Sequence, residues 1–160
     1  MKAVIISDIH GNFYYMKKLD DYLNNNPIDK LIILGDLGNE EQVINILNKY
    51  KDIIIAVRGN CDRNNNLLFD NSGDIKKISL DYKEVFITHG HLIPYFYNVI
   101  KDNIVFCGHT HIYNLDGQYI NPGSIGEPRK NDEHTFLMYQ NGILSLINLD
   151  NYEVIESRKL

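Results

Sequence analysis

Short apolar runs rich in Val, Ile and Leu alternate along this chain with stretches whose apolar side chains recur at helical spacing. Residues 2–7 carry a continuous apolar run, which is typical of a strand buried on both faces. Residues 12–25 follow with helical spacing and end at an Asn-rich stretch before Pro27, which stops a helix. This alternation predicts an α/β fold.

The remaining elements are predicted in the same way. Further strands are expected at residues 31–34, 53–57 and 104–107, a helix at 40–50, a hairpin from 75–80 and 84–88, and a loop leading into a short helix within 91–101. The polar residues 63–73 are expected to form a surface loop. Beyond residue 112 strands are expected at 113–115, 118–120, 134–139, 143–148 and 152–156. Asp116-Gly117 and Asn141-Gly142 lie between paired runs and signal hairpins.

Composition narrows the class of protein. The 160 residues suit one domain spanning residues 1–160. No apolar run approaches the ~20 residues that a membrane span needs, and the first run is too short for a signal-peptide core, so a cytoplasmic protein is expected. The net charge of −5, without a basic stripe, disfavours binding to large nucleic acids or anionic membranes. Two cysteines make no disulfide framework.

Potential metal ligands follow the predicted strands. Four of the six histidines form two His-x-His pairs. The carboxyl ends of five predicted strands are followed by Asp8 and His10, by Asp36, by Asn60, by His89 and His91, and by His109 and His111. Because sites in α/β sheets form at the carboxyl ends of strands, we expect these side chains to converge. In extended backbone residues two apart point to the same side, so Asp8 with His10, and His109 with His111, could share one ion or divide between two.

The number of candidate ligands favours two metal ions over one. One transition-metal ion uses roughly four to six ligands. Seven are available here: Asp8, His10, Asp36, Asn60, His89, His109 and His111. A pair of ions ~3.5–4 Å apart, bridged by a carboxylate, would use all of them, as at many phosphoryl-hydrolysing sites. Histidine and carboxylate donors suit Mn, Fe, Zn or Co. Two divalent ions outweigh two carboxylates, so such a centre would attract a phosphate.

Five short motifs resemble, in chain order, the signature blocks of the calcineurin-like metallophosphoesterases. They are Asp8-Ile9-His10, Gly35-Asp36, Gly59-Asn60-Cys61-Asp62, Thr88-His89-Gly90-His91 and Gly108-His109-Thr110-His111. Residues 56–62 and Asn121-Pro122-Gly123-Ser124 are similar to the small YfcE-like phosphodiesterase branch. The resemblance implies a four-layer α/β/β/α sandwich of two mixed sheets, with both ions at one sheet edge.

The resemblance also implies a ligand set and a reaction. Asp8, His10 and His111 would bind the first ion, Asn60, His89 and His109 would bind the second, and Asp36 would bridge them. The implied reaction is hydrolysis of a phosphodiester by a metal-bridging hydroxide that attacks phosphorus in line with the leaving oxygen. The expected cofactors are two divalent transition-metal ions, with Mn²⁺ first and Ni²⁺, Zn²⁺, Fe²⁺ or Co²⁺ as alternatives.

Cys61 stands where many members of the superfamily carry a histidine that acts at the leaving group. A thiol is a poor replacement for imidazolium as a proton donor, so weak activity on phosphomonoesters is expected. Asp62 and His91 are expected to orient the ligands, and with Asp36, Asn60 and Cys61 they complete the expected catalytic set. Candidates for contact with the substrate phosphate are Asn12, Arg58 and Arg129, although Arg58 could simply end a strand.

Two other functions stay open at this point. The retromer scaffold subunit has the fold of this superfamily and has lost much of its metal chemistry, so a non-catalytic protein-binding scaffold is one alternative. All seven ligand positions hold competent residues here, which argues against it. A nuclease acting on short or cyclic oligonucleotides is the other, since longer substrates would need a basic track. The expected partner is a small phosphodiester substrate, and a homodimer or homotetramer is left open.

Overall fold

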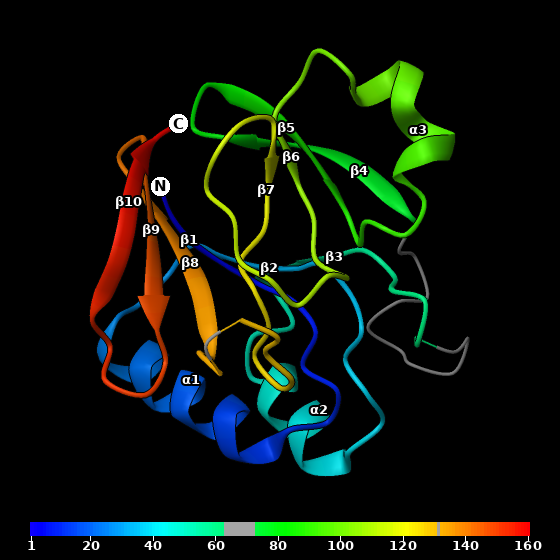
Figure 1. Cartoon of the computed structure of the whole chain (residues 1–160). Helices are drawn as coiled ribbons and strands as arrows, with labels where there is room; N and C mark the ends of the chain where they lie inside the picture. Colours follow the sequence, from blue (N-terminus) through cyan, green and yellow to red (C-terminus); the bar gives the residue numbers. More distant parts are fainter. Residues whose placement is uncertain (63–72, 131) are drawn as a thin grey trace.

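Two β-sheets form the frame of the computed structural model, which describes residues 1–62, 73–130 and 132–160 (Figure 1). The six-stranded sheet has the order β10-β9-β8-β1-β2-β3, and the four-stranded sheet has the order β4-β5-β6-β7. The strands are β1 (Lys2–Ile6), β2 (Lys30–Ile33), β3 (Ile54–Ala56), β4 (Ile75–Leu80), β5 (Lys83–Thr88), β6 (Val105–Phe106), β7 (Tyr119–Ile120), β8 (Thr135–Gln140), β9 (Ile143–Asn148) and β10 (Val154–Lys159). The helices are α1 (Phe13–Asn25), α2 (Glu41–Asn48) and α3 (Ile93–Ile100).

Both sheets mix parallel and antiparallel pairs. In the larger sheet β1, β2 and β3 are parallel, whereas β8, β9 and β10 continue from β1 in antiparallel pairs. In the smaller sheet β5, β6 and β7 are parallel, and β4 is antiparallel to β5. Two mixed sheets with helices outside them confirm the expected fold class.

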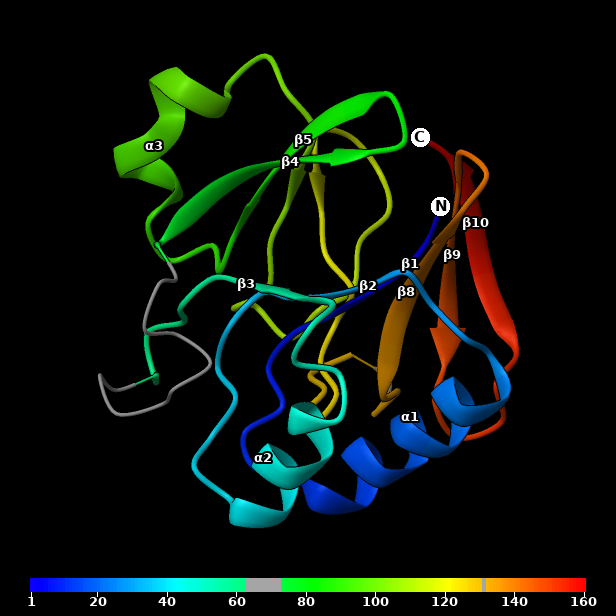
Figure 2. The same cartoon turned by 180° about the vertical axis from the view of Figure 1, so that it is seen from behind.

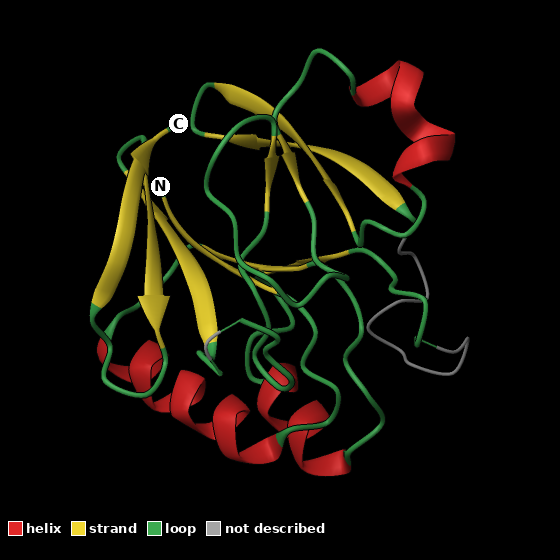
Figure 3. Ribbon diagram, viewed as in Figure 1, coloured by secondary structure: helices red, strands yellow, loops and turns green. Residues whose placement is uncertain are grey.

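The apolar run of β1 is continuous because both faces of this strand are buried. Val4 and Ile6 lie in the core between the six-stranded sheet and the helices α1 and α2. Ala3 and Ile5 lie in the second core, between the two sheets. Figure 3 shows α1 and α2 together on one side of the six-stranded sheet, with the four-stranded sheet on its other side. Because β1 is held on both faces and pairs with β2 and β8, it also holds these two strands in position.

The helical layer outside the four-stranded sheet is thin. It consists of α3, which lies near β4 on the side away from α1 and α2 (Figure 2). Of the eight residues of α3 only Ile100 is buried, and Tyr95, Tyr97 and Val99 are exposed. Within the described residues, no helix is both long and apolar enough to span a membrane.

The prediction of a strand at residues 113–115 is wrong. Asn114 makes an isolated antiparallel bridge to Asn121, and the strand predicted at 118–120 shortens to β7, which pairs in parallel with β6. The side-chain amide of Asn114 donates hydrogen bonds to the carbonyl oxygens of Asp116 (2.9 Å) and Tyr119 (2.7 Å). A side chain thus closes the turn in place of a hairpin ladder.

The second hairpin signal is confirmed, but the strand after that hairpin is displaced. Asn141 and Gly142 have φ angles of 51° and 78°, as the tight turn between β8 and β9 requires. The strand predicted at 152–156 begins instead at Val154 and runs to Lys159. Tyr152 has a φ angle of 60°, which interrupts the extended backbone before that point.

Two other predicted segments differ in extent from the structure. The helix predicted at 40–50 is shorter, because α2 begins at Glu41 and ends at Asn48. The surface loop predicted at 63–73 falls almost wholly on residues 63–72, which lie outside the described residues.

Candidate metal centre

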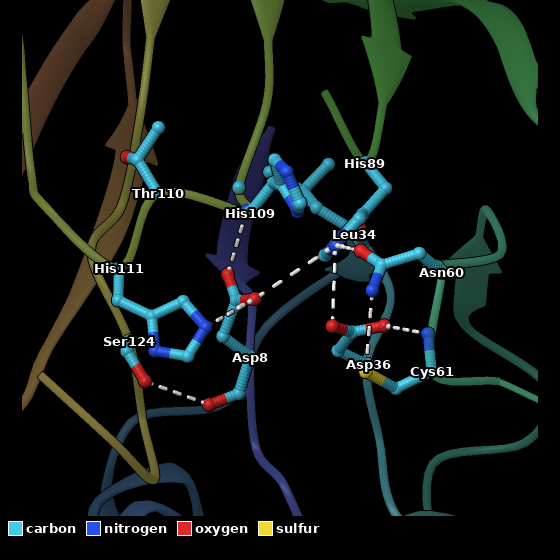
Figure 4. Close-up of polar contacts among 12 residues, drawn as sticks. Asp8, Leu34, Asp36, Asn60, Cys61, His89, His109, Thr110, His111 and Ser124 are labelled. Atoms are coloured by element: carbon cyan, nitrogen blue, oxygen red, sulfur yellow. Dashed lines mark hydrogen bonds and ion pairs between the residues drawn. The ribbon is translucent and has the colours of Figure 1, made fainter. Parts of the chain in front are cut away.

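The candidate ligands follow strands of both sheets, and the structure brings these strand ends together (Figure 4). The six-stranded sheet contributes Asp8 after β1, Asp36 after β2 and Asn60 after β3. The four-stranded sheet contributes His89 after β5 and His109 after β6. The side chains of Asn60 and His89 approach to 3.1 Å across the gap between the sheets. The predicted convergence of the strand ends is therefore confirmed.

Five of the seven candidate ligands have left-handed backbone. The φ angles are 53° at Asp8, 47° at His10, 54° at Asp36, 69° at His109 and 59° at His111. The expectation that residues two apart converge through extended backbone is therefore wrong, since tight turns aim these side chains. Such conformations cost about 1–3 kcal/mol each and persist where the surrounding structure fixes them. Here the backbone N–H of His10 donates to the carbonyl of Asp36 (3.0 Å), which ties one turn to the next.

Two glycines let the backbone pass close to the carboxylates. A Cβ atom at Gly59 would collide with Oδ1 of Asp36. A Cβ atom at Gly108 would collide with Ser7 Oγ and with Oδ2 of Asp8. The chain after β3 and β6 therefore contacts the carboxylates directly, which only glycine allows at these two positions.

Asp8, His10 and His111 form one group of metal-binding donors, whose ligand atoms all lie within 4.8 Å of one another. Oδ1 of Asp8 lies 3.2 Å from Nε2 of His111 and 3.8 Å from Nε2 of His10, and these two nitrogens are 3.2 Å apart. The other carboxylate oxygen of Asp8 accepts a hydrogen bond from the backbone N–H of His109 (3.0 Å). Oδ1 is buried and accepts no hydrogen bond among the described residues.

Asp8, Asp36 and His89 form a second group of donors within 4.8 Å. Oδ2 of Asp36 lies 3.3 Å from Nε2 of His89 and 3.7 Å from Nε2 of His10. Oδ1 of Asn60 lies 3.1 Å from the same nitrogen of His89. Asp8 belongs to both groups, and Asp36 also lies near a histidine of each, so both carboxylates are within reach of two ions.

Hydrogen bonds to backbone carbonyls decide which nitrogen of two histidines faces the centre. Nδ1 of His89 lies 2.8 Å from the carbonyl oxygen of Leu34, and Nδ1 of His111 lies 2.6 Å from that of Glu127. A carbonyl oxygen only accepts, so Nδ1 carries the proton in both rings. In the neutral ring the lone pair is then on Nε2, which is the arrangement found in metal-binding histidines.

These tautomers leave acceptors facing acceptors. Nε2 of His89 faces the oxygens of Asn60 and Asp36, and Nε2 of His111 faces Oδ1 of Asp8, at 3.1–3.3 Å. Lone pairs at these distances repel unless a cation lies among them. The donor set of imidazole nitrogens, carboxylates and one amide oxygen fits divalent transition metals.

The charges of the carboxylates shift the pKa values of their neighbours. Burial raises the pKa of Asp36, but the neighbouring His89 ring and a hydrogen bond from the Cys61 backbone N–H outweigh this effect and hold the pKa of Asp36 well below its usual range. The Asp8 carboxylate raises the pKa of His10. Burial lowers the pKa of His89, and the Asp36 and Asp8 carboxylates more than reverse that effect. The centre therefore has a negative potential that favours bound cations.

His109 and His91 lie beside the second group of donors. The ring centroids of His109 and His91 are 5.2 and 5.4 Å from that of His89, and 5.9 Å from each other. Neither joins a group of donors within 4.8 Å in the described part of the chain. Burial and the neighbouring His89 lower the pKa of both rings. His91 contacts the rings of the other two without a hydrogen bond to either, and its predicted orienting role would act through packing.

Asp62 fixes the turns that carry two candidate ligands. Its carboxylate accepts hydrogen bonds from the backbone N–H groups of Asp36 (2.8 Å), Leu37 (2.9 Å) and Gly59 (2.8 Å). The end of β2 is thereby joined to the end of β3. This geometry supports the prediction that Asp62 orients the ligands.

Cys61 lies at the edge of the centre, and its side chain is exposed. Its backbone N–H donates to Oδ1 of Asp36 (2.8 Å), and its sulfur accepts a hydrogen bond from the Asn60 amide (3.3 Å). Partial desolvation and the Asp36 carboxylate raise the pKa of the Cys61 thiol to about 11. Without a metal the side chain is therefore a neutral thiol at pH 7.

A cavity of about 710 Å³ opens beside the candidate ligands. Of the three candidates for substrate contact, Arg129 lines this cavity. Neither Asn12 nor Arg58 is among the described residues that line it. Asn12 caps α1 and donates a hydrogen bond to the carbonyl of Gly126 (3.0 Å), and Nε of Arg58 lies 3.8 Å from Asp74 Oδ1. The cavity is lined by His10, Asp36, Asn60, Cys61, His109, Thr110, His111, Ile112, Glu127 and Arg129.

Sequence reasoning missed the groups that hold the ligands in place. The backbone carbonyl oxygens of Leu34 and Glu127 set the tautomers of His89 and His111. Every residue has a backbone carbonyl, so the sequence does not indicate which carbonyls take this role. Ser124 Oγ donates to the carbonyl of Asp8 (2.8 Å) and accepts from the N–H of Glu127 (2.8 Å). Its signal was its place in the motif at residues 121–124.

The sequence of residues 1–141 matches the family model of the calcineurin-like phosphoesterase superfamily domain. This chain belongs to the calcineurin-like phosphoesterase superfamily. Phosphodiesterase YfcE of Escherichia coli strain K12 is 29% identical to it over 97% of this chain and 96% of the relative. These matches confirm the resemblance drawn from the motifs. Membership supports phosphoester hydrolysis, and it implies divalent metal ions, for which the donor groups described above are suited.

Several solved structures share the fold of this chain. The phosphoesterase Yfce from E. coli has a TM-score of 0.80 at 25% identity, with 99% of each chain covered. A novel archaeal phosphodiesterase has a TM-score of 0.70 at 25% identity and full coverage of both chains (100%). Vps29 from Entamoeba histolytica has a TM-score of 0.75 at 20% identity, covering 100% of this chain and 99% of the other, and shows a shared fold alone.

The substitution Asp62→Asn should weaken metal binding. An amide has one acceptor oxygen for three backbone donors, so the turns that carry Asp36 and Asn60 would loosen. We expect Mn²⁺ affinity to fall by about 10–100-fold, the usual effect of losing a group that orients ligands. Isothermal titration calorimetry of metal-stripped protein with Mn²⁺ measures this affinity. Unchanged Mn²⁺ affinity in folded Asp62→Asn protein would show that Asp62 does not orient the ligands.

Proposed function

We propose that this protein hydrolyses small phosphodiesters at a centre of two divalent metal ions. The observation that carries the proposal is the set of facing acceptors. Nε2 of His89 and His111 lies 3.1–3.3 Å from oxygens of Asn60, Asp36 and Asp8, with both Nδ1 atoms committed to backbone carbonyls. The names of two relatives, phosphodiesterase YfcE and an archaeal phosphodiesterase, support a diester substrate.

The two donor groups share Asp8, and the distances from Asp36 to a histidine of each group support a division in which Asp36 is the bridge. We assign Asp8, His10 and His111 to the first ion, Asn60, His89 and His109 to the second, and Asp36 to both. The support for Asp36 is its position 3.3 Å from His89 Nε2 and 3.7 Å from His10 Nε2. The support for His109 is its ring beside His89 and its place in the cavity wall. Mn²⁺ is our first choice, with Ni²⁺, Zn²⁺, Fe²⁺ and Co²⁺ as alternatives.

The protein groups around this centre supply positioning and charge. Bound divalent ions would lower the pKa of the attacking water and neutralise charge on the phosphate. The hydrogen bond from the Cys61 backbone N–H to Oδ1 of Asp36 helps to keep this carboxylate ionised. Arg129 lines the cavity, where its guanidinium can bind a phosphate oxygen. A cavity of about 710 Å³ suits a small molecule, and the net charge of −5 disfavours long nucleic acids.

Cys61 favours diesters over monoesters. With its pKa at about 11, the thiol is a weak proton donor to a leaving alkoxide. Diesters with good leaving groups need little protonation at the leaving oxygen. We therefore propose weak activity on phosphomonoesters.

The test is hydrolysis of bis(p-nitrophenyl) phosphate beside p-nitrophenyl phosphate by chelator-stripped protein resupplied with Mn²⁺. We expect metal-dependent turnover that is faster on the diester. Asp36→Asn should lower kcat by about 10²-fold or more, since charge stabilisation at a reacting phosphate has this magnitude. Asp21→Asn, an exposed carboxylate on α1, is the matched control and should leave kcat unchanged.

Two results would contradict the proposal. Folded protein that turns over neither ester with Mn²⁺, Co²⁺, Ni²⁺ or Zn²⁺ would favour a non-catalytic scaffold. Faster turnover of the monoester would contradict the diester preference.

Cys61→His should raise monoesterase activity. An imidazolium at the edge of the centre can donate a proton or a hydrogen bond to the leaving oxygen, and general acid catalysis contributes about 10²–10⁴-fold when fully effective. We expect a gain of at least about tenfold in kcat/KM on p-nitrophenyl phosphate, since the introduced ring is not optimally placed. The matched control is Cys61→Ala, which removes the thiol without adding an imidazole. The other cysteine, Cys107, is buried and offers no comparable exposed position. No gain over Cys61→Ala would show that the thiol does not set the preference.

A further inference from the structure

We propose that Cys61 is a metal ligand for thiophilic cations. Besides the two donor groups described above, His10, Asp36 and Cys61 would then form a third group, which holds an ion such as Zn²⁺ or Cd²⁺. The inference rests on the proposed metal centre, because it uses two of its ligands. It concerns a side chain that the seven-ligand assignment leaves out. With this mode the identity of the bound metal would decide whether Cys61 takes part in the centre.

The geometry of the three side chains carries the proposal. Ligand atoms of His10, Asp36 and Cys61 all lie within 4.8 Å of one another. All three residues line the same cavity. The backbone N–H of Cys61 donates to Oδ1 of Asp36 (2.8 Å), which fixes the start of the Cys61 side chain beside that carboxylate. Oδ2 of Asp36 lies 3.7 Å from Nε2 of His10, so one cation can contact both.

A second observation concerns the side of His10 that faces Asp8 and is independent of the cysteine. Asp8 is fully buried, and its Oδ1 lies 3.8 Å from His10 Nε2 while it accepts no hydrogen bond among the described residues. A buried carboxylate oxygen without a hydrogen-bond donor is costly unless a cation is near. Oδ1 of Asp8 therefore adds negative potential to the space that His10 and Asp36 share, and favours a cation there.

The chemistry of the donors separates two classes of metal. Thiolate ligands select Zn²⁺ and other soft cations, whereas Mn²⁺ prefers oxygen. When a thiophilic ion binds, the S–H bond of Cys61 breaks, the proton leaves to solvent, and the sulfur donates its electron pair to the ion. Mn²⁺ would leave Cys61 as a neutral thiol. Cys61 lines the cavity, so an ion bound through its sulfur would have this ligand on a residue of the cavity wall.

The experiment is optical titration of chelator-stripped protein with Co²⁺. We expect visible d–d bands together with a near-ultraviolet sulfur-to-cobalt charge-transfer band. Cys61→Ser should keep the d–d bands and lose the charge-transfer band. Cys107→Ala is the matched control, because Cys107 is the other cysteine and is buried, and it should keep both.

The other outcomes of this titration overturn the proposal in distinguishable ways. d–d bands without a charge-transfer band in the unsubstituted protein would leave the metal centre intact and exclude Cys61 as a ligand. A charge-transfer band that survives Cys61→Ser would assign the sulfur ligand elsewhere. Absence of all cobalt bands in folded protein would contradict the metal centre itself, and with it the proposed function.

Competition with a chromogenic chelator extends the test to the metals of interest. Cys61→Ser should weaken Zn²⁺ binding by about tenfold or more and Mn²⁺ binding by no more than about twofold, because thiolate is a soft ligand. Equal weakening of both metals would overturn the selectivity. Near-ultraviolet circular dichroism of both proteins confirms that the comparison is made between folded states.

Discussion

Repulsion among acceptor atoms is the constraint on which the rest of this structure depends. The imidazole nitrogens of His89 and His111 and the oxygens of Asn60, Asp36 and Asp8 face one another at 3.1–3.3 Å, and most of these groups are shielded from water. Left alone, such a cluster would spread apart or take up protons, which is what the raised pKa values of His10 and His89 express. Cations turn the same cluster into a set of favourable contacts.

The fold opposes this repulsion with a rigid frame. β1 has neighbours on both edges and cores on both faces, so Asp8, two residues beyond its end, cannot move without disturbing two sheets. Left-handed turns at the strand ends, close contacts at Gly59 and Gly108 and the three hydrogen bonds to Asp62 complete the frame. Strain of about 1–3 kcal/mol at each such turn is tolerated because the cores are well buried.

Sequence periodicity predicted the buried strands well, because a short, continuous apolar run such as that of β1 is stable in water only where both faces of the strand are covered. It failed at residues 113–115 and at Tyr152, where a side-chain amide and a left-handed residue override the pattern. The identities of the clustered side chains could be predicted from Asp and His placed after strands. The way in which these side chains approach one another could not be predicted. Nothing in the sequence shows that His10 has a left-handed backbone conformation or that the Leu34 carbonyl accepts a hydrogen bond from His89.

Anomalous diffraction from crystals soaked in Mn²⁺ would test the central claim most directly. We predict two manganese peaks ~3.5–4 Å apart, one near Asp8, His10 and His111, the other near Asn60 and His89, with Asp36 between them. A single peak among these residues would contradict the two-ion assignment. No peak at the strand ends, in crystals where Mn²⁺ reaches the cavity, would contradict the view that the facing acceptors are there to hold metal.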